Sequence, residues 1–178
     1  MENEERHEVS GHLGPSFSTI DDKGRIALGE DRAKYLEGGH VLVRGDLGCL
    51  EIYPIEAWKA RVSEFDNCPE RVRGKQVYRT LVIGTADKTV KMDEGGRLVV
   101  PPALREKCRL PKPTKELDSK ESREIVFITT GVCIQVWSKE EHRKFEDDPY
   151  GYDEKRALDI QRAYDEMNRF LDREPATV

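Results

Sequence analysis

The chain lacks any long hydrophobic run. No stretch approaches the roughly eighteen apolar residues that a membrane-spanning helix needs. The first six residues, Met1–Arg6, have an acidic net charge and contain no apolar segment, so they do not have the pattern of a signal peptide. We therefore expect a cytoplasmic protein rather than a membrane or secreted one.

Cysteine is scarce, and the common active-site motifs are absent. None of the four cysteines (Cys49, Cys68, Cys108 and Cys133) forms a C-x-x-C pair or has zinc-site spacing. We predict that they are reduced and buried, and a disulfide between two of them is the alternative. The chain also has no P-loop, no dinucleotide fingerprint and no G-x-S-x-G nucleophile motif. We therefore predict no enzymatic activity, no cofactor and no metal site.

Basic residues do not predominate, which is a mild objection to a nucleic-acid binder. The net charge is −5. Residues 1–110 carry 18 basic and 19 acidic residues, a net charge of −1, and residues 111–178 carry 12 and 16, a net charge of −4. Most of the acidity therefore lies towards the C-terminus, and local clusters of charge are more informative than the total.

The most informative feature present is an internal repeat. Asp21–Leu28 (DDKGRIAL) returns 72 positions later as Asp93–Val100 (DEGGRLVV), so both copies read Asp-x-x-x-Arg with glycine just before the arginine. Cys49–Pro54 matches Cys133–Ser138 at an offset of 84, which implies about twelve extra residues in the second copy. The hydrophilic segment 111–123 fits this insertion. A repeat of this length predicts one folding unit used twice.

The repeat resembles the MraZ family of bacterial regulators, which belongs to the AbrB-like swapped-hairpin DNA-binding proteins. The segments that carry the resemblance are Ser18–Leu28, Gly48–Pro54 and Lys91–Arg105. Two departures stand out, since Gly29–Asp31 replaces the usual proline-led helix start and the second turn has no lysine. The resemblance implies an α+β fold of two tandem swapped-hairpin, β-barrel-type units with flanking helices and a C-terminal helical extension.

The predicted organisation has four parts. These are a disordered N-terminus (1–14), a first repeat (15–82), a second repeat (83–146) and an acidic helical tail (147–178). Expected strands are Phe17–Ile20, Arg25–Leu28, His40–Arg44, Cys49–Tyr53, Thr89–Met92, Arg97–Val100, Ile125–Thr129 and Cys133–Trp137. Expected helices are Asp31–Leu36, Pro54–Phe65, Glu70–Leu81, Pro101–Lys107, one from Ser138 with a capping box to Glu141, and Tyr152–Arg173. The apolar stripe of the tail packs on the chain itself or on another subunit, or the tail swings freely.

The hairpin arginines are the candidate DNA-binding residues. Arg25 and Arg97, with Lys23 beside the first, can contact guanine edges or phosphate from an exposed hairpin rim. The competing interpretation is a structural Asp–Arg pair that fixes each hairpin, and both roles can coexist. Asp21 and Asp93 would orient the arginines, while Gly24 and Gly96 would permit the tight turns.

A second basic cluster comprises Arg71, Arg73, Lys75 and Arg79. It is a solvated helix face, a phosphate contact or a contact to an acidic neighbouring subunit. Arg105, in the helix that follows the second motif, is interpreted as structural.

The resemblance implies a sequence-specific regulator of the division and cell wall gene cluster. Such a protein would bind short direct repeats of double-stranded DNA in its own promoter as a ring-shaped homo-oligomer associated with the bacterial nucleoid. The alternative is a ring-forming structural or interaction protein in which DNA binding is weak or lost.

Overall fold

The computed structural model describes residues 15–112 and 123–171. The predicted disorder of residues 1–14, most of the predicted insert and the end of the tail lie outside these ranges. The elements in chain order are β1 (Ser16–Thr19), β2 (Arg25–Ala27), α1 (Glu30–Tyr35), β3 (His40–Arg44), β4 (Leu50–Pro54), α2 (Ile55–Ser63), α3 (Arg73–Leu81), η1 (Ile83–Thr85), β5 (Arg97–Val99), α4 (Pro102–Lys107), β6 (Glu124–Thr129), β7 (Ile134–Ser138), α5 (Lys139–Asp147) and α6 (Glu154–Leu171).

The strands form two antiparallel sheets. Five strands pair in the order β1-β6-β7-β4-β3, and β2 pairs with β5 in a separate two-stranded ribbon. Strands from the two sequence repeats are therefore interleaved, since β1 pairs with β6 and β2 with β5. The predicted mixed α+β class is confirmed. The described residues form no closed barrel, so the barrel-type part of the prediction is not observed.

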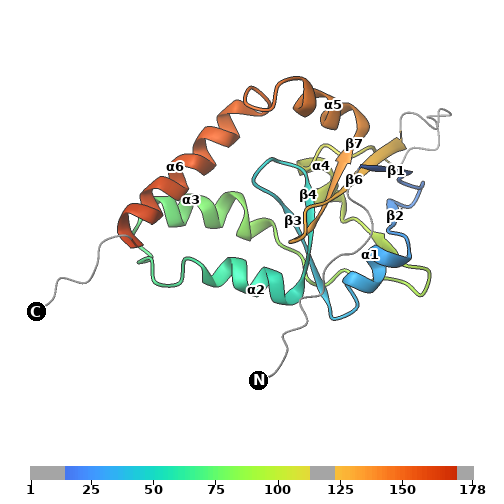
Figure 1. Ribbon diagram of the computed structural model, residues 1–178, viewed down its shortest axis with the longest axis horizontal. Helices are drawn as coiled ribbons and strands as arrows, with labels where there is room; N and C mark the ends of the chain where they lie inside the picture. The colour runs from blue at the N-terminus through green and yellow to red at the C-terminus, as the bar shows by residue number, and fades with distance from the viewer. Residues whose placement is uncertain (1–14, 113–122, 172–178) are drawn as a thin grey trace, which may run out of the picture.

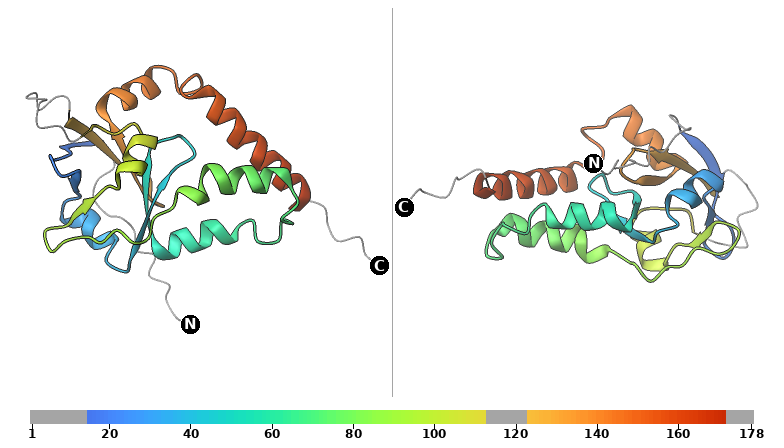
Figure 2. Two further views of the ribbon diagram at one scale, coloured as in Figure 1. Left: turned by 180° about the vertical axis from the view of Figure 1, so that it is seen from behind. Right: turned by 60° about the horizontal axis from the view of Figure 1, so that its bottom comes forward.

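The five-stranded sheet is the middle of three layers (Figures 1 and 2). One face packs its apolar side chains, including Leu42, Ile52 and Val136, against Ile26 and Leu98 of the ribbon. The other face packs Val43 and Tyr53 against α3 and α6, and Trp137 against α5. Side chains alternate between the faces of a strand, so each central strand contributes to both cores. The ribbon and the long helices consequently lie on opposite sides of the sheet.

The structure repeats as the sequence predicts. At an offset of 72, β2 and α1 correspond to β5 and α4; at an offset of 84, β3, β4 and α2 correspond to β6, β7 and α5. If the start of α3 is moved along the chain by 84 residues, it falls inside α6. These two helices pack side by side (Figure 2). Helix α6 thus occupies in the second copy the place that α3 holds in the first.

One predicted strand is wrong, and two helices start two or three residues later than predicted, with α6 beginning at Glu154 rather than Tyr152. Thr89–Met92 forms no continuous strand, and this region contributes only isolated bridges, from Asp87 to Leu42 and from Met92 to Leu98. Helix α3 begins at Arg73 rather than Glu70, because Val72 is extended and turns precede it. The edge of the sheet next to β3 is therefore less regular than the edge formed by β1.

The C-terminal helix packs on the chain's own body, as the first of the three predicted alternatives proposes. Ile160, Ala163 and Met167 are buried against Tyr78 in the cluster that also contains Phe65. Arg156 is buried as well and donates from Nη2 to the carbonyl oxygen of Gly45 at 2.8 Å. The apolar stripe predicted from the sequence is a packing surface within one chain.

All four cysteines are buried and free, which confirms the first interpretation of their role. Burial raises the pKa of the Cys108 thiol to about 12, so it stays protonated at neutral pH. Within the described ranges, no helix is both long and apolar enough to cross a membrane.

Candidate nucleic-acid interface

The first Asp-x-x-x-Arg motif forms a tight turn closed by its own aspartate. One carboxylate oxygen of Asp21 accepts the backbone N–H groups of Lys23 and Arg25, at 2.9 and 2.8 Å. The other oxygen accepts from Nε of Arg25 at 2.5 Å. Gly24 has φ +75°, a left-handed conformation that glycine adopts at no steric cost. The motif therefore fixes both the backbone turn and the direction of the arginine side chain.

The second motif repeats this geometry. Asp93 accepts from the backbone N–H of Arg97 at 3.0 Å and from its Nε at 2.8 Å, and Gly96 has φ +69°. The backbone N–H of Arg97 lowers the pKa of the Asp93 carboxyl, and its guanidinium adds to that effect. For Asp21, burial raises the pKa, but the hydrogen bonds from Arg25 and Lys23 outweigh it and leave a lowered value. Both aspartates are ionised at neutral pH.

The two arginines share one face of the ribbon. Arg25 lies opposite Val99, and Arg97 lies opposite Ala27. Between these pairs, Ile26 and Leu98 face each other and are completely buried. Because side chains alternate along a strand, the other four residues point away from the core. Arg25 and Arg97 are diagonal neighbours on that outer face, about 7–8 Å apart by the usual geometry of antiparallel pairs.

Each guanidinium keeps donors available for a ligand. Asp21 and Asp93 bind Nε of their arginines, and the Nη1 and Nη2 atoms make no hydrogen bond to any residue within 15–112 or 123–171. The Arg97 side chain is 46% exposed and that of Arg25 is 29% exposed. Lys23 is exposed at the first turn, next to Gly24. The ribbon therefore presents two oriented arginine forks and one lysine to solvent.

The predicted second basic cluster is spread over more than one environment. Lys75 is buried, donates to the carbonyl oxygen of Cys68 at 2.6 Å and pairs with Glu70 at 3.0 Å. Arg79 also pairs with Glu70, while Arg71 and Arg73 are exposed. The contact of this basic cluster with DNA phosphate remains a prediction. Helix α3 lies across the five-stranded sheet from the ribbon, so these residues do not extend the arginine face (Figure 1).

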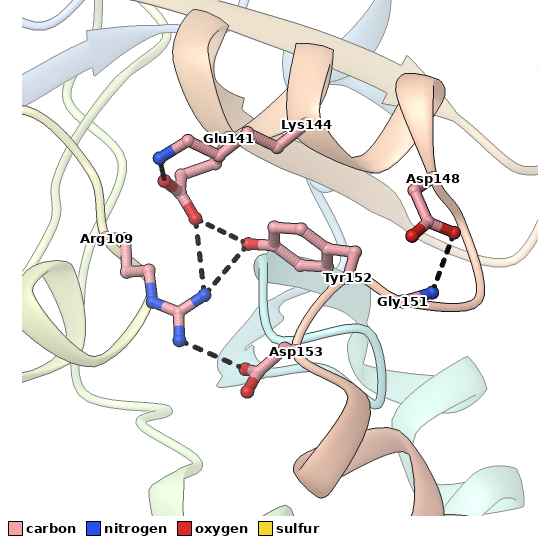
Figure 3. A pocket seen from close by; sticks show the side chains of 7 residues that line it. All are labelled: Arg109, Glu141, Lys144, Asp148, Gly151, Tyr152 and Asp153. Atoms are coloured by element: carbon pink, nitrogen blue, oxygen red, sulfur yellow. Dashed lines mark hydrogen bonds and ion pairs between the residues drawn. The ribbon is translucent and has the colours of Figure 1, made fainter.

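A polar hollow of about 430 Å³ lies where α5 turns into α6 (Figure 3). Arg109 donates to Glu141 at 3.2 Å and to Tyr152 at 3.3 Å, and it pairs with Asp153 at 3.4 Å. Tyr152 donates to the same Glu141 oxygen at 2.8 Å, and burial together with this carboxylate raises the Tyr152 pKa to about 12. These groups satisfy one another's hydrogen-bonding and charge requirements. The contacts that line the hollow therefore hold the segment after α4, helix α5 and the start of α6 together.

This geometry defines a class of protein, namely a tandem-repeat α+β protein that carries paired arginine hairpins on a two-stranded ribbon. The family model for the MraZ protein, described as a putative antitoxin-like protein, matches residues 13–72 and 84–162. The chain belongs to the MraZ family.

Several relatives carry the name Transcriptional regulator MraZ. One such protein from Thermus thermophilus is 30% identical over 122 residues, which cover 68% of this chain and 78% of the relative. The Lachnoclostridium phytofermentans protein is 32% identical over 128 residues, covering 72% and 82%. The Cutibacterium acnes protein is 29% identical over 133 residues, covering 75% and 85%. This membership supports a role in transcription regulation, which is not an enzyme class.

Proposed function

We propose that this protein is a sequence-specific DNA-binding regulator of the division and cell wall gene cluster, and that it binds short direct repeats in its own promoter. The observation that carries the proposal is the pair of arginines, Arg25 and Arg97, on the outer face of the β2–β5 ribbon. A two-stranded ribbon fits the major groove, where arginine pairs with the O6 and N7 atoms of guanine. Both arginines retain the Nη donors that such a pairing uses.

The spacing of the arginines suggests how they read DNA. A diagonal separation of about 7–8 Å corresponds to about two base-pair steps at ~3.4 Å each. Val99, 48% exposed, and Ala27 lie on the same face and offer apolar contact to a thymine methyl group. Asp21 and Asp93 orient the forks, and their own pairing with arginine reduces repulsion from phosphate. Lys23 adds a phosphate contact at the first turn.

We also propose the assembly and domain organisation that the family resemblance implies. The exchange of strands between repeats, with β1 on β6 and β2 on β5, supports a swapped-hairpin arrangement of segments 15–82 and 83–146, followed by the helical tail 147–178. A chain with two non-identical halves presents different faces to its neighbours, and such contacts close into a ring or run into a filament. We propose the closed ring, which is what the family resemblance implies. A ring would join many weak hairpin contacts on a promoter with several repeats, since linkage raises the effective concentration of each contact. Such a regulator would be cytoplasmic and associated with the nucleoid.

The alternative is a ring-forming interaction protein with weak or lost DNA binding. The net charge of −5 favours it. So does the second turn, where Asp93 and Glu94 outnumber Arg97. In this case the ribbon arginines would only stabilise their hairpins.

Titration of a fluorescently labelled duplex from the chain's own upstream region separates the two functions. Arg25→Ala should weaken specific binding by about 1–3 kcal/mol for each bidentate pair lost, with an unchanged circular dichroism spectrum. Arg25→Lys should also weaken it, because lysine keeps the charge but not the planar fork. Arg169→Ala, in the last turn of α6 far from the ribbon, is the control (Figure 1). Wild-type affinity in both Arg25 variants would contradict the proposed role of the ribbon.

A further inference from the structure

Arg105 lies against the first hairpin turn although it belongs to the second repeat. A Cβ atom added to Gly24 would overlap Nη1 of Arg105 and lie 3.2 Å from its Cζ. The guanidinium thus covers the glycine of the Asp21–Arg25 turn, which explains why Gly24 is buried at an otherwise exposed turn. The contact brings a third cation to the turn that already carries Lys23 and Arg25.

This guanidinium has no counter-charge among the residues that the structure describes. Among residues 15–112 and 123–171, Arg105 makes no ion pair and no side-chain hydrogen bond, whereas Arg25 and Arg97 each have their own aspartate. Partial burial lowers the pKa of Arg105, and no carboxylate offsets that effect. A structural arginine normally satisfies its donors within the fold. An arginine held over a turn with all of its donors free is instead suited to an external anion.

The second turn has no equivalent cation. At the repeat offset of 72, the counterpart of Arg105 is Ala33, and its Cβ would lie 3.2 Å from a Cβ added to Gly96. The Asp21–Arg25 turn has two acidic and two basic residues, so Arg105 gives it a net charge of +1. The Asp93–Arg97 turn has two acidic residues and one arginine, a net charge of −1. The two ends of the ribbon therefore differ by two units of charge.

We propose that Arg105 binds a phosphodiester of the DNA backbone beside the first turn, while Arg25 contacts the neighbouring base edge. The inference rests on the proposed function and deepens it. Phosphate contacts fix the register and orientation of a protein on the duplex. Because Arg105 has no counterpart at the second turn, this contact would anchor the first end of the ribbon only. The base contacts of Arg25 and Arg97 would then set the direction in which the ribbon reads each repeat.

Salt-dependent binding tests this role, because a phosphate contact and a base contact respond differently. Affinity for the promoter duplex and for an unrelated duplex of equal length would be measured by anisotropy between about 50 and 200 mM salt. Arg105→Ala should weaken binding to both duplexes by a similar factor. It should also reduce the slope of log K against log salt by about 0.9 per protomer bound, or about 3.5-fold in affinity across that range. Arg105→Lys should keep the wild-type slope.

The controls distinguish this inference from the function on which it rests. Arg25→Ala should lower the ratio of specific to unrelated affinity, and Arg105→Ala should leave that ratio unchanged. Arg169→Ala removes one positive charge elsewhere and should change neither affinity nor slope. If Arg105→Ala disturbs folding, as seen in the fluorescence of Trp58 and Trp137, Arg105→Gln keeps more of the side chain and replaces it. A wild-type slope and affinity in folded Arg105→Ala or Arg105→Gln would overturn the inference alone, whereas a wild-type chain that binds neither duplex would overturn the proposed function with it.

Discussion

Replacing Gly74 by alanine should destabilise this protein, although the same change in an ordinary helix is stabilising. Gly74 is the second residue of α3, and glycine in a helix costs at most about 0.8–1.0 kcal/mol relative to alanine. At this position, however, an added Cβ would overlap the carbonyl oxygen of Ala163 in α6. It would also lie 2.9 Å from Cβ of Glu166 and 3.1 Å from Cα of Ala163. None of these atoms is the end of a flexible side chain, so α3 and α6 must separate to admit the methyl group.

The cost of that separation should exceed the gain in helix propensity. Inserting a methyl group into a closely packed contact costs about 1–3 kcal/mol. Because the overlap is mainly with backbone atoms, we take the upper part of that range, about 2–3 kcal/mol. Subtracting the propensity gain then leaves an expected loss of about 1–2 kcal/mol. For a chain of this size, each kcal/mol lowers the melting temperature by about 2–4 °C. The loss should be felt in the cluster that joins α3 and α6, which includes Tyr78 and Met167.

Thermal melting followed by circular dichroism measures the effect, and Gly38→Ala is the matched control. A Cβ on Gly38 meets no atom within 4 Å, and that residue is not in the left-handed region. Its replacement should leave the melting temperature unchanged or raise it slightly, because alanine restricts the unfolded chain. If Gly74→Ala melts at or above the wild-type temperature, the close approach of α3 to α6 is refuted.

Three further results are expected. Light scattering at micromolar concentration should give a mass well above the 20.4 kDa of one chain, and a monomer would rule out the ring. Truncation after Asp148 should lower the melting temperature or change the oligomer, since each large buried side chain of α6 contributes about 1.5–3 kcal/mol. DNA binding should survive this truncation, so its loss at unchanged oligomer size would contradict the separate roles of ribbon and tail. The lowered pKa of Asp93 means that its ionised carboxylate stabilises the fold. This stabilisation is complete above about pH 3.8 and is lost as the pH falls through the lower pKa of the folded state. The difference in stability between wild type and Asp93→Asn, measured by urea unfolding, should therefore vanish at low pH. A difference that grows on acidification would show that the ionised form is not the stabilising one.

The fold was largely predictable because its repeat carries strong local signals. Glycine turns, a capping serine and alternating apolar strands each specify structure within a few residues. Ser138, for example, caps α5 by accepting the backbone N–H of Glu141, as the Ser-x-x-Glu spacing predicts. The Glu141 carboxylate does something that the spacing does not predict, because it binds Lys144, Arg109 and Tyr152. Long-range partners decide such details, and the local sequence does not identify them.

The dependence on long-range partners also explains why one predicted strand was wrong and why the sequence left several alternatives open for the tail. Thr89–Met92 is the repeat counterpart of Phe17–Ile20, most of which forms β1, but a strand needs a partner along its length, and here only isolated bridges form. The apolar stripe of α6 is visible in the sequence, whereas the surface that it covers is not. Gly74 gave no signal at all, since a helical glycine is informative only once Ala163 lies beside it.

The candidate site was predictable in part for the same reason. The pairing of Asp21 with Arg25 and of Asp93 with Arg97 is local, and its geometry follows from the motif. The position of both arginines on one face depends on the register between β2 and β5, which no local pattern reveals. Arg105 is interpreted as structural from its helix alone, because its neighbour, Gly24 of the other repeat, is distant in the sequence. An internal alignment would have flagged the Ala33/Arg105 difference without giving its meaning.

Fusion of the two repeats into one chain allows residues near the pseudo-symmetry axis to differ. Glu51 and Gln135 are repeat equivalents that face each other between β4 and β7, and Nε2 of Gln135 donates to the Glu51 carboxylate at 3.2 Å. Burial raises the pKa of Glu51, so a second glutamate in the facing position would place two carboxyl groups in a site that already disfavours one charge. Two identical chains could not avoid that meeting by changing only one partner. A fused chain can, and the same freedom permits Arg105 at one turn and Ala33 at the other, which gives the two ends of the ribbon different charges and places the proposed phosphate contact at one end only.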